Sequence, residues 1–317
     1  MADWIERVRG GDRRALARSL TLAESADQAL LSALDSVFAS LPRPTRIGIT
    51  GPPGAGKSTL TSGLIAAFRA QGARVGVVAI DPTSPFSGGA LLGDRLRMAR
   101  HALDAEVFVR SMATRGQFGG LSAGTEDACD LLALAGFDPL MVETVGVGQS
   151  EVDVAGLADT TLVVLTPAAG DSVQALKAGI MEIADVVVIN KSDLEGAARL
   201  EEDVKEALEL RPMPPPGAPC WKPPIVRTVA TSEQGLEGLM GAIADHRAHL
   251  QRHGLLEGLH SRRQERRYEE LAGQGLLARL HAQGAAAAAF EQHRRAVASG
   301  QLSPREAARR LIEQLAL

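Results

Sequence analysis

Cysteine is scarce in this chain, and its scarcity excludes several classes of protein. The 317 residues contain two cysteines, Cys129 and Cys220, which lie far apart in the sequence. Neither a disulfide framework nor a cysteine-based zinc motif can be built from them. We interpret both as ordinary thiols in a reducing compartment.

A basic surplus and long apolar runs are also lacking. The formal net charge is −4 and the isoelectric point is near 6.0, which argues against a general nucleic-acid binder. No stretch reaches the ~20 apolar residues of a membrane span. The first 18 residues mix acids, arginines and Trp4, unlike a signal sequence. We therefore expect a cytoplasmic protein that binds neither nucleic acid nor a membrane.

The chain instead alternates short apolar runs with helix-like segments. Seven runs are predicted to be strands: residues 46–50, 74–80, 106–110, 140–143, 160–166, 186–190 and 225–229. Apolar runs separated by helices predict an α/β fold with a mostly parallel central sheet, covered by helices on both faces. Helical patterns before and after this region predict an N-terminal extension (residues 1–41), a central domain (42–240) and a C-terminal arm (241–317).

The C-terminal arm is predicted to be entirely helical. Helices are expected at about residues 236–253, 256–282, 285–298 and 303–316, and Ser303 is placed as an N-cap before Pro304. From His260 onward there are ten arginines against six glutamates. We interpret this basic surplus as a solvated helix face or a self-association surface rather than as a site for an acidic partner.

A phosphate-binding loop follows the first predicted strand. The segment fits the pattern G-x-x-x-x-G-K-[ST], in which glycines let backbone N–H groups approach phosphates and the following helix adds its dipole. Lys57 is expected to reach the β- and γ-phosphates, and the Ser58 hydroxyl to ligate Mg²⁺. The predicted phosphate-binding residues are Gly51, Pro52, Pro53, Gly54, Ala55, Gly56, Lys57, Ser58 and Thr59. The chain has five lysines, so a chance match is improbable.

A second motif predicts that the base is guanine. Asn190, Lys191 and Asp193 fit N-K-x-D directly after a predicted strand, at the sheet edge where α/β folds bind ligands. A carboxylate such as Asp193 can accept both the N1–H and the 2-amino group of guanine, whereas adenine offers no such pair. Asn190 is expected to bond N7, and the stem of Lys191 to cover the base. The backbone N–H of Ala230 is a weaker candidate for a contact to guanine O6.

Three acids at or near strand ends are predicted to serve magnesium and catalysis. Asp81, Asp94 and Glu143 are expected to act on Mg²⁺ mostly through water, together with Ser58, because Mg²⁺ keeps several waters. With Lys57 they form the predicted catalytic set. The N–H of Gly146, in the sequence Glu-x-x-Gly, is expected to bond the γ-phosphate. Residues 82–93 are rich in Pro, Ser and Gly, which is typical of a switch loop.

Two expected catalytic features cannot be assigned from the sequence. No glutamine stands out as the residue that positions the attacking water, although Gln149 follows Gly146. An arginine finger cannot be chosen among Arg95, Arg97, Arg110 and Arg115. We therefore expect slow intrinsic hydrolysis that a partner accelerates.

Four stretches in one order resemble the methylmalonyl-CoA mutase-associated G proteins, a family also labelled MeaB, ArgK or MMAA. They are residues 48–58, 81–89, 93–98 and 142–151, and the resemblance is strong over about residues 40–240. It implies a homodimeric GTPase chaperone that gates adenosylcobalamin loading into a B₁₂-dependent acyl-CoA mutase and protects that mutase. The cofactor then belongs to the mutase, and a cobalamin adenosyltransferase is a further candidate partner. The resemblance also implies a third switch with Gln174 and Lys177 as coupling residues.

Other interpretations remain open at this point. The C-terminal helices match the family less well, so the client could be methylmalonyl-CoA, isobutyryl-CoA, 2-hydroxyisobutyryl-CoA or ethylmalonyl-CoA mutase. A GTP-dependent metallochaperone of the nickel-insertion type is the main alternative, but two isolated cysteines and seven scattered histidines supply no evident metal store. A kinase and a binding module with a dead nucleotide site are weaker alternatives.

Overall fold

The computed structural model describes residues 2–82, 99–114, 123–144, 150–167, 179–212, 215–282 and 284–315. Its internal contacts divide the chain into two compact units, residues 1–260 and 261–317. The boundary falls within one long helix, α11 (Leu255–His281). We describe each unit by itself.

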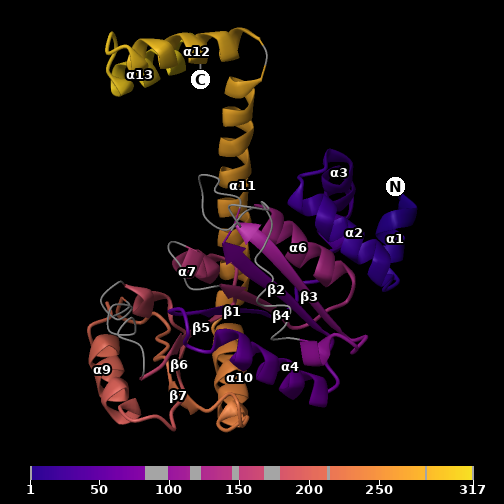
Figure 1. The fold of residues 1–317 in the computed structure, drawn as a ribbon, viewed down its shortest axis with the longest axis vertical. Coiled ribbons are helices and arrows are strands. Elements are labelled where there is room, and N and C mark those ends of the chain that lie inside the picture. Colours follow the sequence, from indigo (N-terminus) through magenta and orange to yellow (C-terminus); the bar gives the residue numbers. More distant parts are fainter. Residues whose placement is uncertain are drawn as a thin grey trace. The chain divides into compact units, whose positions relative to one another are not determined.

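A seven-stranded sheet forms the centre of the first unit (Figure 1). Every pair of neighbouring strands among the described residues is parallel, as expected from the apolar runs. The order across the sheet is β3-β2-β4-β1-β5-β6-β7. The strands are β1 (Arg46–Thr50), β2 (Val75–Pro82), β3 (Val107–Thr114), β4 (Leu140–Thr144), β5 (Thr160–Leu165), β6 (Val186–Asn190) and β7 (Ile225–Thr228).

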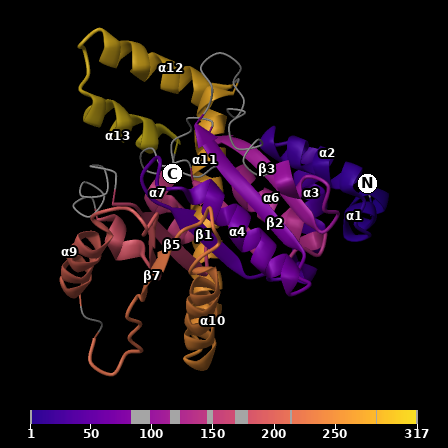
Figure 2. The same ribbon diagram turned by 60° about the horizontal axis from the view of Figure 1, so that its bottom comes forward.

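Side-chain alternation along the strands explains why both faces of the sheet are covered. On β5, Leu162 and Val164 pack against α4 (Lys57–Ala70) and α10 (Leu236–Arg252), which lie side by side on one face (Figure 2). The alternate residues, Val163 and Leu165, pack on the opposite face against α9 (Ala197–Glu209). Successive side chains of a strand point to opposite faces, so a strand buried on both sides is apolar over most of its length.

The rest of the opposite face is covered by α6 (Ala123–Leu134) and three N-terminal helices. These are α1 (Ala2–Arg9), α2 (Arg13–Glu24) and α3 (Gln28–Val37). Leu16, Leu20 and Leu30 from this group are fully buried in one cluster with α6. The N-terminal extension is therefore helical, as predicted, and is part of the main hydrophobic core.

Strand β3 differs most from its predicted run. The expected run at residues 106–110 becomes β3, which continues to Thr114 because it pairs with β2 over eight residues. The polar residues Arg110 and Ser111 interrupt the apolar pattern and conceal this continuation in the sequence. Arg110 forms an ion pair with Glu24 of α2, so the guanidinium of this arginine-finger candidate is held by the N-terminal helices.

A buried ion cluster joins the start of β1 to α6. Arg46 is 5% exposed, and its guanidinium lies 2.7 Å from Glu126 and 3.0 Å from Asp130. An isolated buried charge is unfavourable. Here the attraction between the guanidinium and the two carboxylates offsets the cost of removing these charges from water. This cluster fixes the strand that leads into the phosphate loop.

The second unit contains the end of α11 and two further helices, α12 (Ala285–Ala298) and α13 (Pro304–Leu315), which pack on each other. All begin and end within about two residues of the predicted helices. The Ser303 hydroxyl accepts a hydrogen bond from the Glu306 N–H at 3.2 Å, which confirms the predicted N-cap. Short helical segments elsewhere are η1 (Phe38–Ser40), η2 (Ala99–His101), α7 (Ser150–Asp153), η3 (Val154–Gly156) and η4 (Ile180–Ile183).

Candidate nucleotide-binding site

The predicted phosphate-binding segment begins with residues 51–56, which join the carboxyl end of β1 to α4, and continues into the first turn of that helix. Two of its glycines are required by close approaches. Gly51 has φ +136°, and a Cβ there would lie 2.1 Å from the carbonyl oxygen of Val164 on β5. Gly56 has φ +91°, and a Cβ there would lie 2.3 Å from Asn190 Nδ2. Any larger residue at either position would push the loop away from the neighbouring strands.

Within the loop, Lys57 curls back over the backbone. Its Nζ donates to the carbonyls of Gly51 at 2.6 Å and Pro52 at 3.0 Å, and the side chain is buried. Ala55 and Pro52 are buried, Pro53 and Gly54 are exposed, and Thr59 is half-buried on the first turn of α4. The ammonium group is therefore held at the loop, where the sequence places the β- and γ-phosphates.

Glu143, at the end of β4, lies directly against the first turn of α4. It is 1% exposed, and its Oε1 and Oε2 accept hydrogen bonds from the hydroxyls of Ser58 at 2.5 Å and Thr61 at 2.8 Å. β4 pairs with β1, with Glu143 opposite Ile49, so Glu143 is brought beside the start of the phosphate loop. Thr61 was not predicted as a site residue, although it lies three residues after Ser58 and hence on the same helix face.

The predicted guanine residue Asn190 has a fixed amide orientation. Its Oδ1 accepts hydrogen bonds from the Thr228 hydroxyl and the Ala230 N–H, both at 3.1 Å, and its Nδ2 donates to Ala55 O at 2.9 Å. One Nδ2 hydrogen remains for a nucleotide base. The Ala230 N–H, predicted to contact guanine O6, is thus bonded to Asn190, and a base oxygen would share or replace that acceptor.

Lys191 and Asp193 lie in the turn after β6. Lys191 has a left-handed φ of +54° and its Nζ donates to Gly54 O at 2.9 Å, so the base turn and the phosphate loop are bonded at two points. Asp193 is exposed. An exposed carboxylate beside two residues that hold the loop has the geometry expected of a base-recognition group.

Several predicted residues lie outside the described part of the structure. Asp81 falls in β2, but only its backbone is described. Asp94, Gly146, Gln174 and Lys177 lie outside the described residues altogether. Their roles, and those of Asp193 and Ala230 toward a base, stay predictions.

Hydrogen bonds between residues that the sequence did not single out connect the strand ends at the phosphate loop. The Thr144 hydroxyl donates to Thr50 Oγ1 at 3.1 Å, and Thr50 donates to the carbonyl of Glu151 in α7 at 3.1 Å. Burial raises the pKa of the Glu151 carboxyl, and the nearby Lys57 ammonium partly offsets that effect. No sequence motif marks these residues, because their contacts join β1, β4 and α7.

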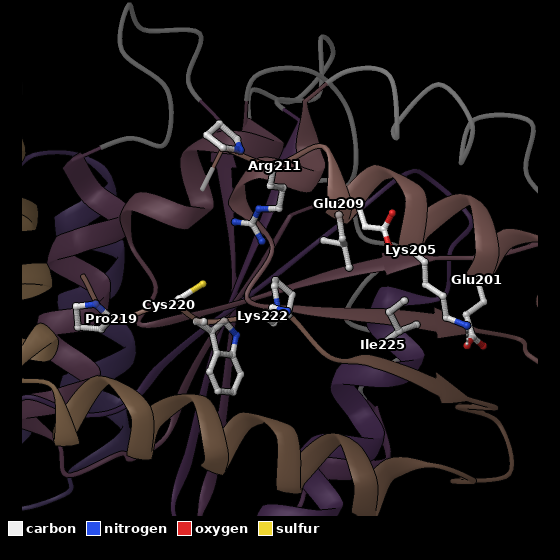
Figure 3. A pocket seen from close by; sticks show the side chains of 12 residues that line it. Glu201, Lys205, Glu209, Arg211, Pro219, Cys220, Lys222 and Ile225 are labelled. Carbon is white, nitrogen blue, oxygen red and sulfur yellow. Dashed lines mark ion pairs between the residues drawn. The ribbon is translucent and has the colours of Figure 1, made fainter. Parts of the chain in front are cut away.

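A cavity of about 860 Å³ lies beside β7, between α9 and residues 211–224 (Figure 3). Trp221 and Cys220 line it, and Lys205 on its wall pairs with Glu201 at 2.9 Å. None of the predicted site residues borders this cavity. It lies near the amino end of β7, whereas the phosphate loop follows the carboxyl end of β1 in the same parallel sheet.

Two other kinds of feature are absent from the described ranges. No helix there is long and apolar enough to cross a membrane. In the same part of the chain, no three His, Cys, Asp or Glu side chains gather as a metal-binding group. Neither cysteine forms a disulfide; Cys129 is buried and Cys220 is exposed.

The parallel sheet, the glycine-rich loop and the Lys57–Ser58–Glu143 arrangement define a phosphate-binding-loop NTPase. A family model described as "Methylmalonyl Co-A mutase-associated GTPase MeaB" matches residues 16–285. The chain belongs to this family of GTPases.

Individual relatives agree with this assignment. A Pyrococcus abyssi protein whose name places it among the GTPases is 45% identical, over 98% of this chain and 95% of its own. GTPase ArgK of Escherichia coli is 33% identical, over 99% of this chain and 96% of its own. A crystal structure described as an LAO/AO transport system kinase is 29% identical with a TM-score of 0.73, covering 100% of this chain and 97% of its own.

Proposed function

We propose that this GTPase binds guanine nucleotides through Asn190, Lys191 and Asp193 and serves as the G-protein chaperone of an adenosylcobalamin-dependent acyl-CoA mutase. The partner proposal is carried by the match to a family described as mutase-associated over residues 16–285. A mouse relative, the mitochondrial methylmalonic aciduria type A homolog, supports it with 38% identity over 71% of this chain and 58% of its own. Methylmalonyl-CoA mutase is the first client to test, and the related acyl-CoA mutases follow.

Lys57 is the residue that we expect to respond first to a triphosphate. Its Nζ donates to the backbone carbonyls of Gly51 and Pro52, which are neutral acceptors. Phosphate oxygens are charged acceptors and form stronger bonds with an ammonium group. GTP binding therefore exchanges the carbonyl contacts for phosphate contacts and holds the β- and γ-phosphates on the loop.

The donor set around Ser58 fits a magnesium ion. The hydroxyl of Ser58 donates its hydrogen to Glu143 at 2.5 Å, so it is the hydroxyl oxygen that would face a cation. Glu143 is held by two hydroxyls and can orient water in the metal's outer shell. Asp81 and Asp94 are proposed to complete the set. When bound, Mg²⁺ would offset charge on the phosphate oxygens.

Replacement of Glu143 by glutamine should weaken the response to magnesium. An amide cannot accept from both Ser58 and Thr61, because one of its two ends is a donor. The Mg²⁺ concentration for half-maximal GTP hydrolysis should rise by about ten- to a hundredfold, as for other residues that orient metal ligands. Magnesium titrations of hydrolysis rates measure this directly. The Thr61→Ser variant keeps the hydroxyl and should behave as wild type, and an unshifted Glu143→Gln titration would contradict the role.

The partner proposal is tested by steady-state GTP hydrolysis, with ATP as the control nucleotide. Turnover of GTP should be slow alone and faster with one purified adenosylcobalamin-dependent acyl-CoA mutase. The Lys177→Ala variant should keep intrinsic hydrolysis and lose most of the stimulation, while Lys205→Ala, on the exposed side of α9, should lose none. If every mutase leaves turnover unchanged, the chaperone proposal is wrong and the metallochaperone alternative returns.

We further infer that two copies associate through the C-terminal arm, residues 241–317, in the cytoplasm. Half-exposed Leu271, Leu276 and Leu277 on α11 support an association surface, because a partner that covered them would bury large apolar side chains. A cobalamin adenosyltransferase is a second candidate partner. Light scattering of the full chain, compared with a Leu276→Glu and Leu277→Glu variant, tests the dimer: equal masses for both would contradict it.

A further inference from the structure

A cluster outside the predicted site joins η2 to α4 and to the turn that follows β7. Arg100 Nε donates to the Ser62 hydroxyl of α4 at 2.7 Å, and Arg100 NH1 lies 3.3 Å from Glu233 Oε1. His101 Nε2 lies 3.0 Å from both the hydroxyl and the carbonyl oxygen of Ser62. Burial lowers the pKa of His101 below its usual value, so the guanidinium is the cation of this cluster at neutral pH.

The turn that Arg100 reaches, residues 229–235, carries the Ala230 N–H. It is closed by hydrogen bonds from the Val229 N–H to Gln234 O and from the Ser232 N–H to Val229 O, both 3.0 Å. Glu233 has a left-handed φ of +60°. The described residues include three non-glycines of this kind, and two of them, Lys191 and Glu233, lie in the two predicted guanine turns. Such backbone strain persists only where surrounding contacts hold it.

The same turn is tied to the phosphate-loop helix at two further places. Asn190 joins the turn to the phosphate loop, because its Oδ1 accepts from the Ala230 N–H at 3.1 Å and its Nδ2 donates to Ala55 O at 2.9 Å. Leu236, the first residue of α10, packs so closely on Gly63 of α4 that a Cβ at Gly63 would lie 2.7 Å from its Cδ1. Ser62, the anchor of Arg100, is the residue before Gly63. These contacts form a closed ring. Asn190 joins the phosphate loop to the turn. Glu233 of the turn pairs with Arg100, and Arg100 is bonded to Ser62 of α4, the helix that follows the phosphate loop.

We propose that Arg100, anchored on Ser62 and paired with Glu233, is a positioning residue for guanine recognition that holds the turn presenting the Ala230 N–H to O6 of the base. This inference rests on the proposed guanine site and goes beyond it, because Arg100 and Glu233 match no nucleotide-binding motif. Arg100 acts at a distance from the base, through the turn. Loss of the pair lets the turn relax from its strained conformation, and the nucleotide then leaves faster.

The size of the effect follows from the exposure of the pair. The side chains of Arg100 and Glu233 are 48% and 55% exposed, so salt and water screen their attraction. Exposed ion pairs contribute little to stability or binding, so loss of this pair should change the GDP dissociation rate by about two- to fivefold. The change should shrink as ionic strength rises.

The test is the dissociation rate of fluorescent GDP from the full chain in Arg100→Gln, Glu233→Gln and the double variant. Each single variant should release GDP about two- to fivefold faster, and the double variant no faster than either, because both remove one interaction. The diphosphate of 2,6-diaminopurine riboside is the discriminating probe. It carries an amino group in place of O6 and cannot accept from the Ala230 N–H, so its release should be unchanged. Faster release of both nucleotides would indicate a general structural role and overturn the inference.

A matched control is an ion pair that joins α4 to the chain segment of Arg100 but does not involve the turn at residues 229–235. Arg69 of α4 pairs with Asp104 at 2.8 Å, and Asp104→Asn should leave GDP release unchanged. The preference of wild type for GDP over ADP distinguishes failure of the proposed guanine site from failure of the role proposed for Arg100. If wild type shows no such preference, the guanine site itself is wrong and this inference falls with it. If wild type prefers GDP but the Arg100 and Glu233 variants release it normally, only the role of Arg100 is wrong.

Discussion

Replacement of Lys57 by alanine is expected to weaken GTP binding by about two to four orders of magnitude. The Lys57 ammonium donates two hydrogen bonds at the phosphate loop. Hydrogen bonds to charged groups contribute about 1.5–3 kcal/mol each, and every 1.4 kcal/mol is about tenfold in affinity. Isothermal titration calorimetry with a non-hydrolysable GTP analogue measures the change without turnover.

The control for Lys57→Ala must separate lost charge from lost folding. Lys57 is buried, so its removal could disturb the loop that its carbonyl contacts hold. Lys57→Met keeps most of the side-chain volume without the charge, and both variants should unfold within a few degrees of wild type. Lys205→Ala removes one exposed lysine elsewhere and should bind normally. Affinity within twofold of wild type for Lys57→Met would remove Lys57 from the phosphate site.

Local sequence patterns predicted the parts of the site that consist of consecutive residues. The loop Gly51–Ser58 and the Asn190 turn carry their own signals, because each must satisfy a local backbone requirement as well as a chemical one. The parallel sheet followed from seven apolar runs for the same reason, since a strand buried on both faces is mostly apolar. These expectations depend on neighbours in the sequence. The structure confirms the parallel sheet, and the binding roles of the loop and turn residues stay predictions.

The remaining features depend on contacts between distant residues. Thr61 and Glu143 are separated by 82 positions, and Ser62 and Arg100 by 38, so no local pattern reveals either pair. The Asn190 amide was predicted to bond N7 of a base, which needs its NH2 end, and that contact stays a prediction. Its carbonyl end accepts hydrogen bonds from Thr228 and Ala230, which only the fold brings together. The end of β3 was missed because its pairing with β2, rather than apolar spacing, extends it to Thr114.

Exchange of Asp193 for asparagine is expected to change which base the site prefers. Guanine presents two donors, N1–H and the 2-amino group, and a carboxylate accepts both. An asparagine amide presents one acceptor and one donor, which matches the N1–H and the 2-carbonyl of xanthine instead. Sites that hydrogen-bond a substrate group reject analogues lacking it by large factors, so the ratio of GDP to XDP affinity should fall by about a thousandfold or more.

Competition of GDP and XDP for labelled nucleotide measures the ratio in wild type and variant. Asp193 is exposed, and substitutions at exposed sites usually change the free energy of unfolding by less than about 0.5 kcal/mol, so the variant should fold normally. Glu195→Gln, an exposed acid two residues away in the same turn, changes the charge equally and should keep guanine preference. If Asp193→Asn keeps it too, the carboxylate does not face the base. The hydrogen bonds of Asn190 and Lys191 to the phosphate loop would then be the whole role of this turn.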